Sequence, residues 1–370
     1  MPLPDTTADW ITDRATLDGW LRATPASAVV GLDTEFMRRD TFHPQLALLQ
    51  LGCAGRHALV DPLAFAIDDA LQPVLGAGGT VTVMHSAGED LETLAPFLPD
   101  GPGTLFDTQI AAAFAGMGLG ISYRALVLEL CGDELDKGET RSDWMQRPLT
   151  ASQRSYATLD VVYLESIHQQ LTARLRQRDR FDWFAEDCAR LKQRASHRDG
   201  DPQPQRALRG AAEWASAQQA RLRRFLRWRD RSARTLDRPR PWLLDDALAL
   251  SLAHEPPTSL AELEQRARGQ RALRSAQRSE LFALLAAPIG EDDIAATAPI
   301  PAHPQGAAKQ ALGTMKTFID TTAAALDLPA GLLCPRKVLE DYVVTRQWPD
   351  FLDGWRREVL HERLPALLPG

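Results

Sequence analysis

Long apolar runs are missing from this 370-residue chain, and its cysteines and histidines are not clustered. No segment approaches the roughly 20 apolar residues that cross a bilayer, and the N-terminus MPLPDTTADW lacks the basic-then-apolar order of a signal peptide. Cys53, Cys131, Cys188 and Cys334 form no C-x-x-C pair, which argues against disulfides and thiolate zinc and favours a reducing, cytoplasmic location. The eight histidines form no H-E-x-x-H motif, so a histidine-bound zinc is not expected.

A general excess of positive charge is also missing, because the formal net charge is -7. The distribution of charge is more informative than the total. Between Arg174 and Arg240 there are 19 Arg and Lys residues against 9 Asp and Glu residues. A basic segment inside an acidic chain indicates either a polyanionic partner or a solvated, arginine-rich helical face. Charge alone does not separate these two interpretations.

Strand signals are confined to the first half of the chain. Apolar runs rich in β-branched residues predict strands at 28–36, 46–52, 57–61 and 80–86. Periodic apolar patterns predict helices at 12–23, 89–98, 107–115, 122–131 and 151–175. This mixture predicts an α/β fold, in which the first three strands form a meander and crossover connections follow.

The second half carries helical patterns separated by segments rich in Pro and Gly. We therefore expect an α/β domain at 1–194, a linker at 195–207, a helical domain at 208–288, a linker at 289–306 and a helical domain at 307–370. Each helical domain has a long helix, then a Leu-rich segment and a further helix. This shared order is weak evidence for a duplication.

Two acids come straight after the apolar run of the first predicted strand, in the stretch AVVGLDTEF at 28–36. Side chains alternate across a strand, so Asp33 and Glu35 project from the same face and repel each other. Hydration at a strand end is one explanation for such a pair. Neutralisation by a divalent cation is the other, because hard cations bind carboxylate oxygens.

Two further acids occupy positions that favour the metal hypothesis. Asp90 follows the turn Ser86-Ala87-Gly88 after the strand at 80–86, where open α/β sheets bind ligands, although an acid in a first helical turn also suits the helix dipole. Asp160 lies in the middle of a predicted helix beside its apolar stripe, where an acid needs a partner. A salt-bridged core acid is the alternative for Asp160. Tyr156 is four residues earlier and therefore on the same helix face.

Asp107 is interpreted differently from the other acids. It precedes Thr-Gln at a junction between a strand and a helix, which is typical of an N-cap. We therefore predict a structural role for Asp107.

The ordered set LDTEF, HSAGEDLE and YATLD resembles the DEDD superfamily of 3′–5′ exonucleases, in the branch with a tyrosine four residues before the last Asp. FDTQIAAAF at 106–114 and LDKGETRSDWMQRPLT at 135–150 are similar to the ribonuclease D family. The segment at 228–263 resembles the helicase-and-RNase-D C-terminal (HRDC) domain, and the segment at 332–360 resembles it more faintly. The resemblance extends over nearly the whole chain and implies a ribonuclease-H-like fold followed by two HRDC-type domains.

The resemblance also implies roles for individual residues. Asp33, Glu35, Asp90 and Asp160 are expected to bind two divalent ions, Mg²⁺ or Mn²⁺, and Tyr156 is expected to orient the attacking water. Two ions about 3.5–4 Å apart suit phosphodiester hydrolysis. Because a free tyrosine has a pKa near 10, orientation suits Tyr156 better than general-base action at neutral pH.

Residues for substrate contact are less clearly indicated. Phe36 is expected either to stack on a terminal base or to belong to the core. Lys137, Arg141 and Trp144 are expected either to line the substrate path or to form a solvated loop. The basic stretch RLRRFLRWR at 221–229 suits phosphate contacts, or plain packing of Trp228 among hydrated arginines.

Three functions are compatible with these patterns. The first is a monomeric, metal-dependent 3′–5′ exoribonuclease that trims the free 3′ ends of RNA, tRNA precursors in particular, and releases 5′-mononucleotides. The second applies the same chemistry to DNA. The third is an RNA-binding scaffold without catalysis, which the complete set of five site residues disfavours.

Overall fold

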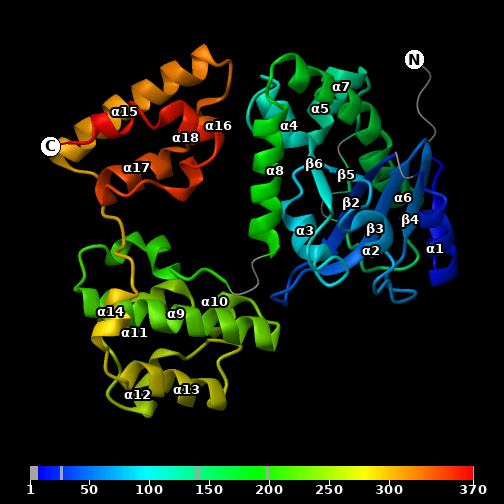
Figure 1. Cartoon of the computed structure of the whole chain (residues 1–370). Coiled ribbons are helices and arrows are strands. Elements are labelled where there is room, and N and C mark those ends of the chain that lie inside the picture. Colours follow the sequence, from blue (N-terminus) through cyan, green and yellow to red (C-terminus); the bar gives the residue numbers. More distant parts are fainter. Residues whose placement is uncertain (1–6, 26–27, 137, 140–141, 197–199, 370) are drawn as a thin grey trace.

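The computed structural model describes residues 7–25, 28–136, 138–139, 142–196 and 200–369. Lys137 and Arg141, two expected substrate contacts, lie outside the described residues. Figure 1 shows an α/β body followed along the chain by two helical units. In the part of the chain that is described, no helix is long and apolar enough to cross a membrane.

A six-stranded mixed sheet forms the centre of the α/β body, in the order β1-β4-β3-β2-β5-β6. The strands are β1 (Asp9–Ile11), β2 (Val29–Met37), β3 (Gln45–Cys53), β4 (Arg56–Val60), β5 (Val81–Met84) and β6 (Thr104–Asp107). β2, β3 and β4 pair antiparallel, whereas β5 and β6 are parallel to β2. The predicted meander and the crossovers that follow it are therefore confirmed, and β1 and β6 are additions to the prediction.

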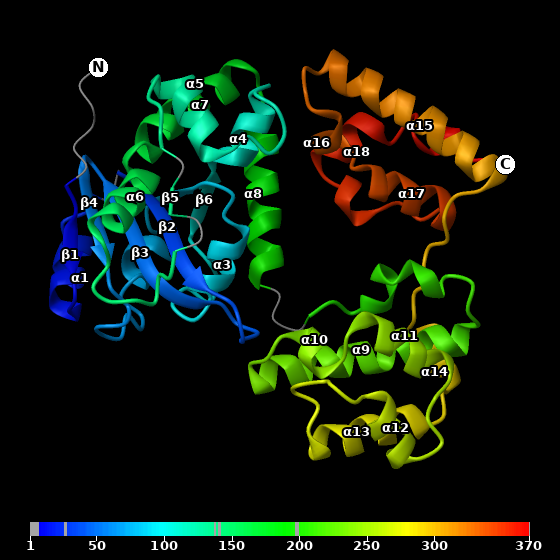
Figure 2. The ribbon, with the colours of Figure 1, turned by 180° about the vertical axis from the view of Figure 1, so that it is seen from behind.

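The helices of the α/β body surround this sheet. They are α1 (Arg14–Arg22), α2 (Gln72–Leu75), α3 (Gly88–Leu94), α4 (Thr108–Phe114), α5 (Tyr123–Cys131), α6 (Ala151–Val162), α7 (Leu164–Gln177) and α8 (Phe181–Ser196). α6 contacts β2, β3 and β4 on one face of the sheet, as Figure 2 shows from behind. A side chain at Gly52 in β3 would meet the Val161 carbonyl at 3.1 Å, so glycine allows this close approach of helix and strand.

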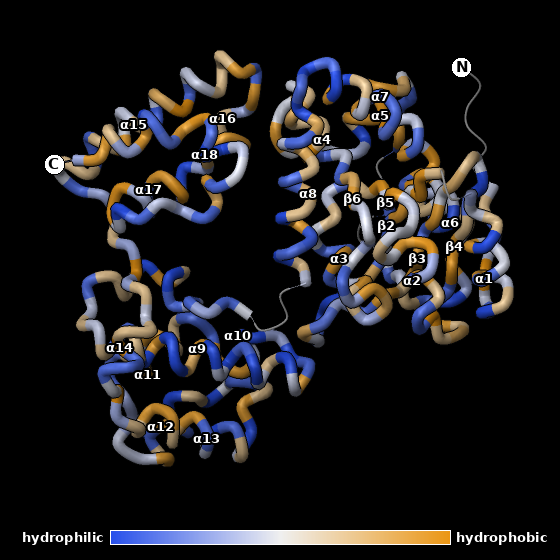
Figure 3. Tube along the Cα trace, in the orientation of Figure 1, coloured by the Kyte–Doolittle hydropathy of each residue, from blue (hydrophilic) through white to orange (hydrophobic). Residues whose placement is uncertain are grey.

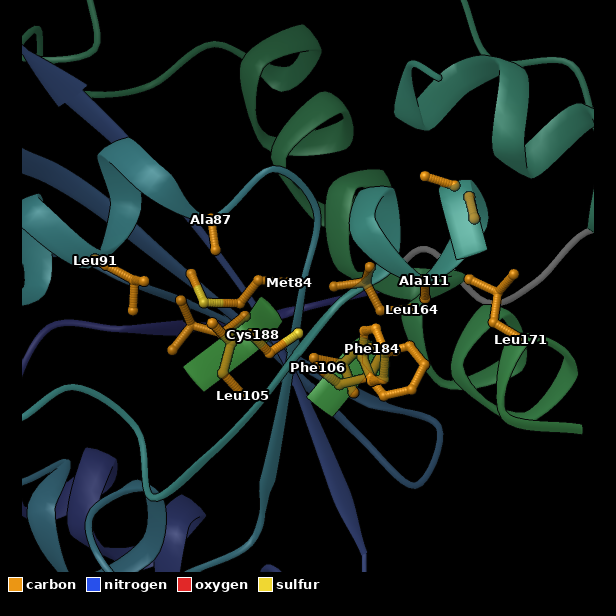
Figure 4. Packing of buried hydrophobic residues seen from close by; sticks show 14 of the residues in the cluster. Met84, Ala87, Leu91, Leu105, Phe106, Ala111, Leu164, Leu171, Phe184 and Cys188 are labelled. Carbon is orange, nitrogen blue, oxygen red and sulfur yellow. The ribbon is translucent and has the colours of Figure 1, made fainter. Parts of the chain in front are cut away.

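The core of the α/β body is formed by apolar side chains from the strands and the covering helices. Figure 3 shows the hydrophobic colouring of the central strands against the largely hydrophilic α9. Side chains from β5, β6, α3, α4, α7 and α8 meet in the close view of Figure 4, among them Met84, Ala87, Leu91, Leu105, Phe106, Ala111, Leu164, Leu171, Phe184 and Cys188. This packing fixes the start of α3 against the carboxyl ends of β5 and β6.

The first helical unit contains η1 (Pro204–Ala207), η2 (Arg209–Ala211), α9 (Ser216–Leu236), α10 (Arg240–Leu243), α11 (Asp246–His254), α12 (Leu260–Arg266), α13 (Ser275–Ala286) and α14 (Glu291–Ala295). The second contains α15 (Gly306–Ala325), α16 (Ala330–Leu333), α17 (Arg336–Thr345), η3 (Asp350–Leu352), α18 (Trp355–Leu360) and η4 (Pro365–Leu367). α14 falls inside the range that the sequence suggested as the second linker.

The two helical units repeat one local arrangement. Each has a long helix, a left-handed aspartate with a φ of 49° (Asp237 or Asp327), a four-residue helix preceded by proline, and a further helix. Both aspartates contact the α/β body. Asp237 accepts hydrogen bonds from the backbone N–H groups of Phe42 and His43, and Asp327 accepts one from Arg178.

Candidate active site

Asp33, in the middle of β2, and Glu35, two residues before the end of the strand, project from its α6-facing side. The register places Asp33 opposite Gln50 and Glu35 opposite Leu48 of β3. A β-bulge follows immediately, between Glu35 and Phe36. Both acids are half-buried, so neither is simply hydrated at a strand end.

Asp90 and Asp160 reach the same region from two helices. Asp90 lies in the first turn of α3 and is 8% exposed, and Thr34, the residue between the strand acids, donates a hydrogen bond to its Oδ1 at 2.5 Å. Asp160 lies on α6, and its Oδ2 is buried with no hydrogen-bond partner among the described residues. Thr34 is a contributor that the sequence reasoning missed.

Burial raises the pKa of all four carboxyl groups, and neighbouring carboxylates of the cluster add to the shift for three of them. Burial raises the pKa of Asp33 well above its usual value, and the nearby charges of Asp90, Asp160 and Glu35 raise it further. Burial, reinforced by neighbouring carboxylates, raises the pKa of Glu35 to about 8 and that of Asp160 to about 8. Burial raises the pKa of Asp90 to about 6, although the Thr34 hydroxyl acts in the opposite direction.

The acids are neighbours rather than a finished metal cage. Within the residues that the structure describes, no three His, Cys, Asp or Glu side chains are already arranged to hold a metal ion. The donor set nevertheless fits a hard divalent cation. It consists of carboxylates alone, their charges are mutually unfavourable, and one buried oxygen of Asp160 is unsatisfied.

Tyr156 lies one turn before Asp160 on α6, which begins with a capping box between Thr150 and Gln153 as predicted. Burial and the charge of Asp160 raise the pKa of Tyr156, so its hydroxyl stays protonated at neutral pH. The chain passes so close to the ring that a Cβ at Gly138 would lie 1.6 Å from Cε2 of Tyr156.

A cavity of about 770 Å³ opens beside these α6 residues. Its wall includes Tyr123, Gly138, Glu139, Ser155, Tyr156 and Asp160. The strand acids are not part of this wall. The cavity therefore adjoins the acid cluster on its α6 side.

The sequence expectations for substrate contacts have different outcomes. Phe36 is half-buried beside the β-bulge, which leaves both of its interpretations open. The prediction for Trp144 is wrong, because its ring is buried among Leu48, Leu59, Leu149 and Ala157. Arg147 donates hydrogen bonds to the Trp144 carbonyl and to Asp61, which ties this segment to the sheet.

The basic stretch of α9 is largely engaged within its own unit. Arg224 donates hydrogen bonds to Asp293 and to three backbone carbonyls, and Arg229 donates to Asp246 and to the Leu244 carbonyl. Trp228 is 1% exposed. The structure thus favours the packing interpretation of this stretch.

Asp107 caps α4, as predicted, by accepting hydrogen bonds from the N–H groups of Gln109 and Ile110. It also accepts bonds from the N–H groups of Ser86 and Ala87, in the turn that leads into α3. Sequence reasoning missed this second role, because the partner lies 20 residues away along the chain.

Comparisons with known proteins agree with this geometry. Residues 8–176 match the family model described as 3'-5' exonuclease. Ribonuclease D of Xanthomonas oryzae pv. oryzae is 44% identical over 363 residues, which cover 97% of this chain and 98% of that protein. Ribonuclease D of Escherichia coli K12 is 30% identical over 364 residues, which cover 94% of each chain.

A solved structure extends the likeness to the whole fold. The crystal structure of Escherichia coli RNase D, an exoribonuclease involved in structured RNA processing, matches with a TM-score of 0.82 and 28% identity over 98% of both chains. The ribonuclease-H-like mixed sheet and the helical C-terminal region inferred from the sequence are therefore confirmed. The chain belongs to the ribonuclease D family of 3′–5′ exoribonucleases.

Proposed function

We propose that this protein removes nucleotides from the 3′ end of RNA by metal-dependent hydrolysis, with Asp33, Glu35, Asp90 and Asp160 as the metal ligands. The observation that carries the proposal is the gathering of these four buried or half-buried carboxyl groups, because burial raises the pKa of each and the charges of neighbouring acids in the cluster raise those of Asp33, Glu35 and Asp160 further. Clustered acids of this kind are costly unless a cation offsets their repulsion. Two divalent ions, Mg²⁺ or Mn²⁺, supply water activation and stabilise the charge of the reacting phosphate when bound.

Other residues of the protein orient a metal ligand, supply a hydrogen bond and provide space for the substrate. Thr34 fixes one oxygen of Asp90 and so limits the orientation of that carboxylate. Tyr156 keeps its proton and can therefore donate a hydrogen bond to the phosphate or accept one from the attacking water. The 770 Å³ cavity beside Tyr156 has a volume in the range of small-ligand sites, which suits a terminal nucleotide.

For the substrate we infer structured RNA with a free 3′ end, tRNA precursors in particular, and 5′-mononucleotides as products. The involvement of Escherichia coli RNase D in structured RNA processing supports this class. The relatives from Xanthomonas oryzae and Escherichia coli are both ribonucleases by name, which favours RNA over DNA. A monomeric state and a cytoplasmic location stay predictions from the sequence.

A time course on 5′-labelled single-stranded RNA tests the proposal. With Mn²⁺ or Mg²⁺ we expect a ladder that shortens from the 3′ end, and EDTA should abolish it. Asp160→Asn should remove most activity because it deletes a ligand charge. Tyr156→Phe should lower kcat by roughly 10²-fold, typical of losing one positioned proton donor, and should leave metal affinity unchanged.

The controls separate the alternative functions. A DNA oligonucleotide of the same sequence should be degraded much more slowly than RNA, and the reverse order would favour the DNA hypothesis. Undiminished activity in EDTA would contradict the metal ligands. Divalent binding without any shortening of RNA would support the scaffold hypothesis.

A further inference from the structure

Gln50 is a polar residue in the middle of a strand that is otherwise apolar and buried. It interrupts the run LALLQLG of β3, and its side chain is 0% exposed. Neither its Nε2 nor its Oε1 has a hydrogen-bond partner within the described part of the chain. Burying an amide without partners is unfavourable, because both its donor and its acceptor lose water. An apolar side chain of similar size would fill this position at lower cost.

The sheet register places this amide beside the acid cluster. Gln50 lies directly opposite Asp33 on the neighbouring strand, and directly opposite residues project from the same face. α6 packs across this face and carries Asp160, whose buried Oδ2 also lacks a partner in the described residues. An unsatisfied amide and an unsatisfied carboxylate oxygen therefore belong to the same face of the same site.

On the opposite face of β2, a side-chain hydrogen bond orients another acid of the cluster. There Thr34 donates a hydrogen bond to Asp90 and fixes one of its oxygens. Asp33 receives no such side-chain donor in the described residues. The Gln50 amide opposite Asp33 has N–H groups with no acceptor among the described residues. Gln50 could therefore donate to Asp33 as Thr34 donates to Asp90.

We propose that Gln50 is a positioning residue, whose amide N–H groups orient the carboxylate of Asp33 for metal binding. The inference rests on the proposed function, since it concerns how the ligands are presented. Donation by an amide favours the charged form of a carboxylate, which is the form that binds a cation. Residues that hold metal ligands typically change metal affinity by about 10- to 100-fold when they are replaced.

Mn²⁺ titration of the full chain by calorimetry, together with thermal unfolding in EDTA, tests this role through Gln50→Met. Methionine has a similar length and no amide. We expect the metal-free variant to unfold at the same or a higher temperature than the wild type, because two unsatisfied polar atoms disappear. We expect its Mn²⁺ affinity to fall by about 10-fold or more.

Thr82→Val is the matched control. Thr82 in β5 also has a buried hydroxyl without a partner in the described residues, but its register partners are Val30 and Leu105, away from the acids. We expect this variant to keep wild-type Mn²⁺ affinity. Loss of Mn²⁺ affinity in Thr82→Val as large as in Gln50→Met would overturn the inference.

Gln50→Asn is a second variant that tests the role of Gln50 if the methionine variant does not fold. It keeps the amide on a side chain that is shorter by one methylene. It should also weaken Mn²⁺ binding. Wild-type affinity in a folded Gln50→Met or Gln50→Asn variant overturns the role of Gln50 and leaves the metal ligands intact. A wild-type protein that binds no Mn²⁺ overturns the proposed function itself, and the inference with it.

Discussion

At the scale of single residues, the site is defined by like charges that the fold holds together. Asp33, Glu35 and Asp160 are drawn from two elements, and burial adds to their repulsion. A carboxyl group with a raised pKa binds a proton more readily in the folded state than in the unfolded state. The metal-free protein therefore loses stability when these protons leave, and a cation that replaces them restores it.

Metal-free stability should accordingly fall as the pH rises. Acids in the unfolded chain titrate near pH 4, whereas in the folded state the pKa of Glu35 and that of Asp160 are raised to about 8. Between these two values the folded state binds more protons than the unfolded state. The free energy of unfolding therefore declines as the pH rises through this window. Even ~1 kcal/mol lowers Tm by roughly 2–4 °C in a domain of this size. Thermal unfolding in EDTA at pH 5.5 and at pH 8 measures the effect.

Two additions sharpen this experiment. Mg²⁺ should raise Tm more at pH 8 than at pH 5.5, because it competes with protons for the same oxygens. Asp33→Asn should raise the metal-free Tm at pH 8 and abolish the stabilisation by Mg²⁺. A metal-free Tm that increases between pH 5.5 and pH 8 would contradict the charge cluster.

At the scale of elements, the start of α3 depends on a side chain from another strand. Asp107 is 1% exposed and accepts N–H bonds from both the α4 cap and the turn before α3. Its two oxygens thus connect the ends of β5 and β6. Asp90 lies three residues beyond Ala87, so the position of a proposed metal ligand rests on this connection.

Asp107→Asn should damage both stability and metal binding. An amide has only one acceptor oxygen, so either Ala87 or the α4 cap loses its partner, at a cost of about 1–3 kcal/mol. We expect a Tm several degrees lower and weaker Mn²⁺ binding. Asp13→Asn is the control, because Asp13 caps the exposed start of α1 and asparagine caps equally well. Equal effects of the two substitutions would contradict a special role for Asp107.

Elements with local sequence signals could be predicted. Elements that depend on partners far away along the chain were missed. The capping box at Thr150 and the N-cap at Asp107 were readable because each lies within three residues of its helix. β1 is three residues long and shows no period. The predicted helix at 151–175 is two helices that meet at Tyr163, and neither Pro nor Gly marks the break.

The same division applies to the candidate site. Asp33, Glu35 and Asp160 stood out because acids conflict with an apolar strand or helix stripe. Asp90 stood out by its place after a strand, and Tyr156 by its spacing from Asp160. Gln50 carried a similar signal in the run LALLQLG, but its meaning required the register with Asp33. Thr34 and Gly138 gave no signal, since a threonine in a strand and a glycine in a loop are ordinary. Their contacts, with Asp90 and with the Tyr156 ring, exist only in three dimensions.

At the scale of the whole molecule, a loop that follows β2 joins the α/β body to the first helical unit. Phe42 is 7% exposed and packs in the core of that unit. The guanidinium groups of Arg234 and Arg240 lie 4.8 and 4.6 Å from its ring centre. Phe42 follows β2 closely along the chain, so the strand that carries two of the acids continues directly into the docking contact.

Phe42→Ala should loosen this attachment. Truncation of a buried phenylalanine typically costs about 3–5 kcal/mol, and here the loss falls on the contact between two parts. We expect faster proteolytic cleavage between α8 and η1. Phe282→Ala, which alters the same core from within the helical unit, should lower Tm without promoting this cleavage. Unchanged cleavage in Phe42→Ala would show that other contacts hold the unit.

The second helical unit contacts the α/β body through a buried ion pair. Arg356 of α18 donates to both oxygens of Asp187 of α8 at 2.6 Å, and Trp355 stacks on Trp183 with ring centres 4.7 Å apart. The chain therefore leaves the α/β body, forms the first helical unit and comes back, so that unit is tethered at both of its ends. If Phe42 leaves the core of the first helical unit, the α/β body and that unit remain tethered. Their effective concentration reaches the order of millimolar for short tethers, so the contact re-forms within the same molecule. Opening of this contact is thus a local and reversible event, after which both parts remain joined by the chain on either side.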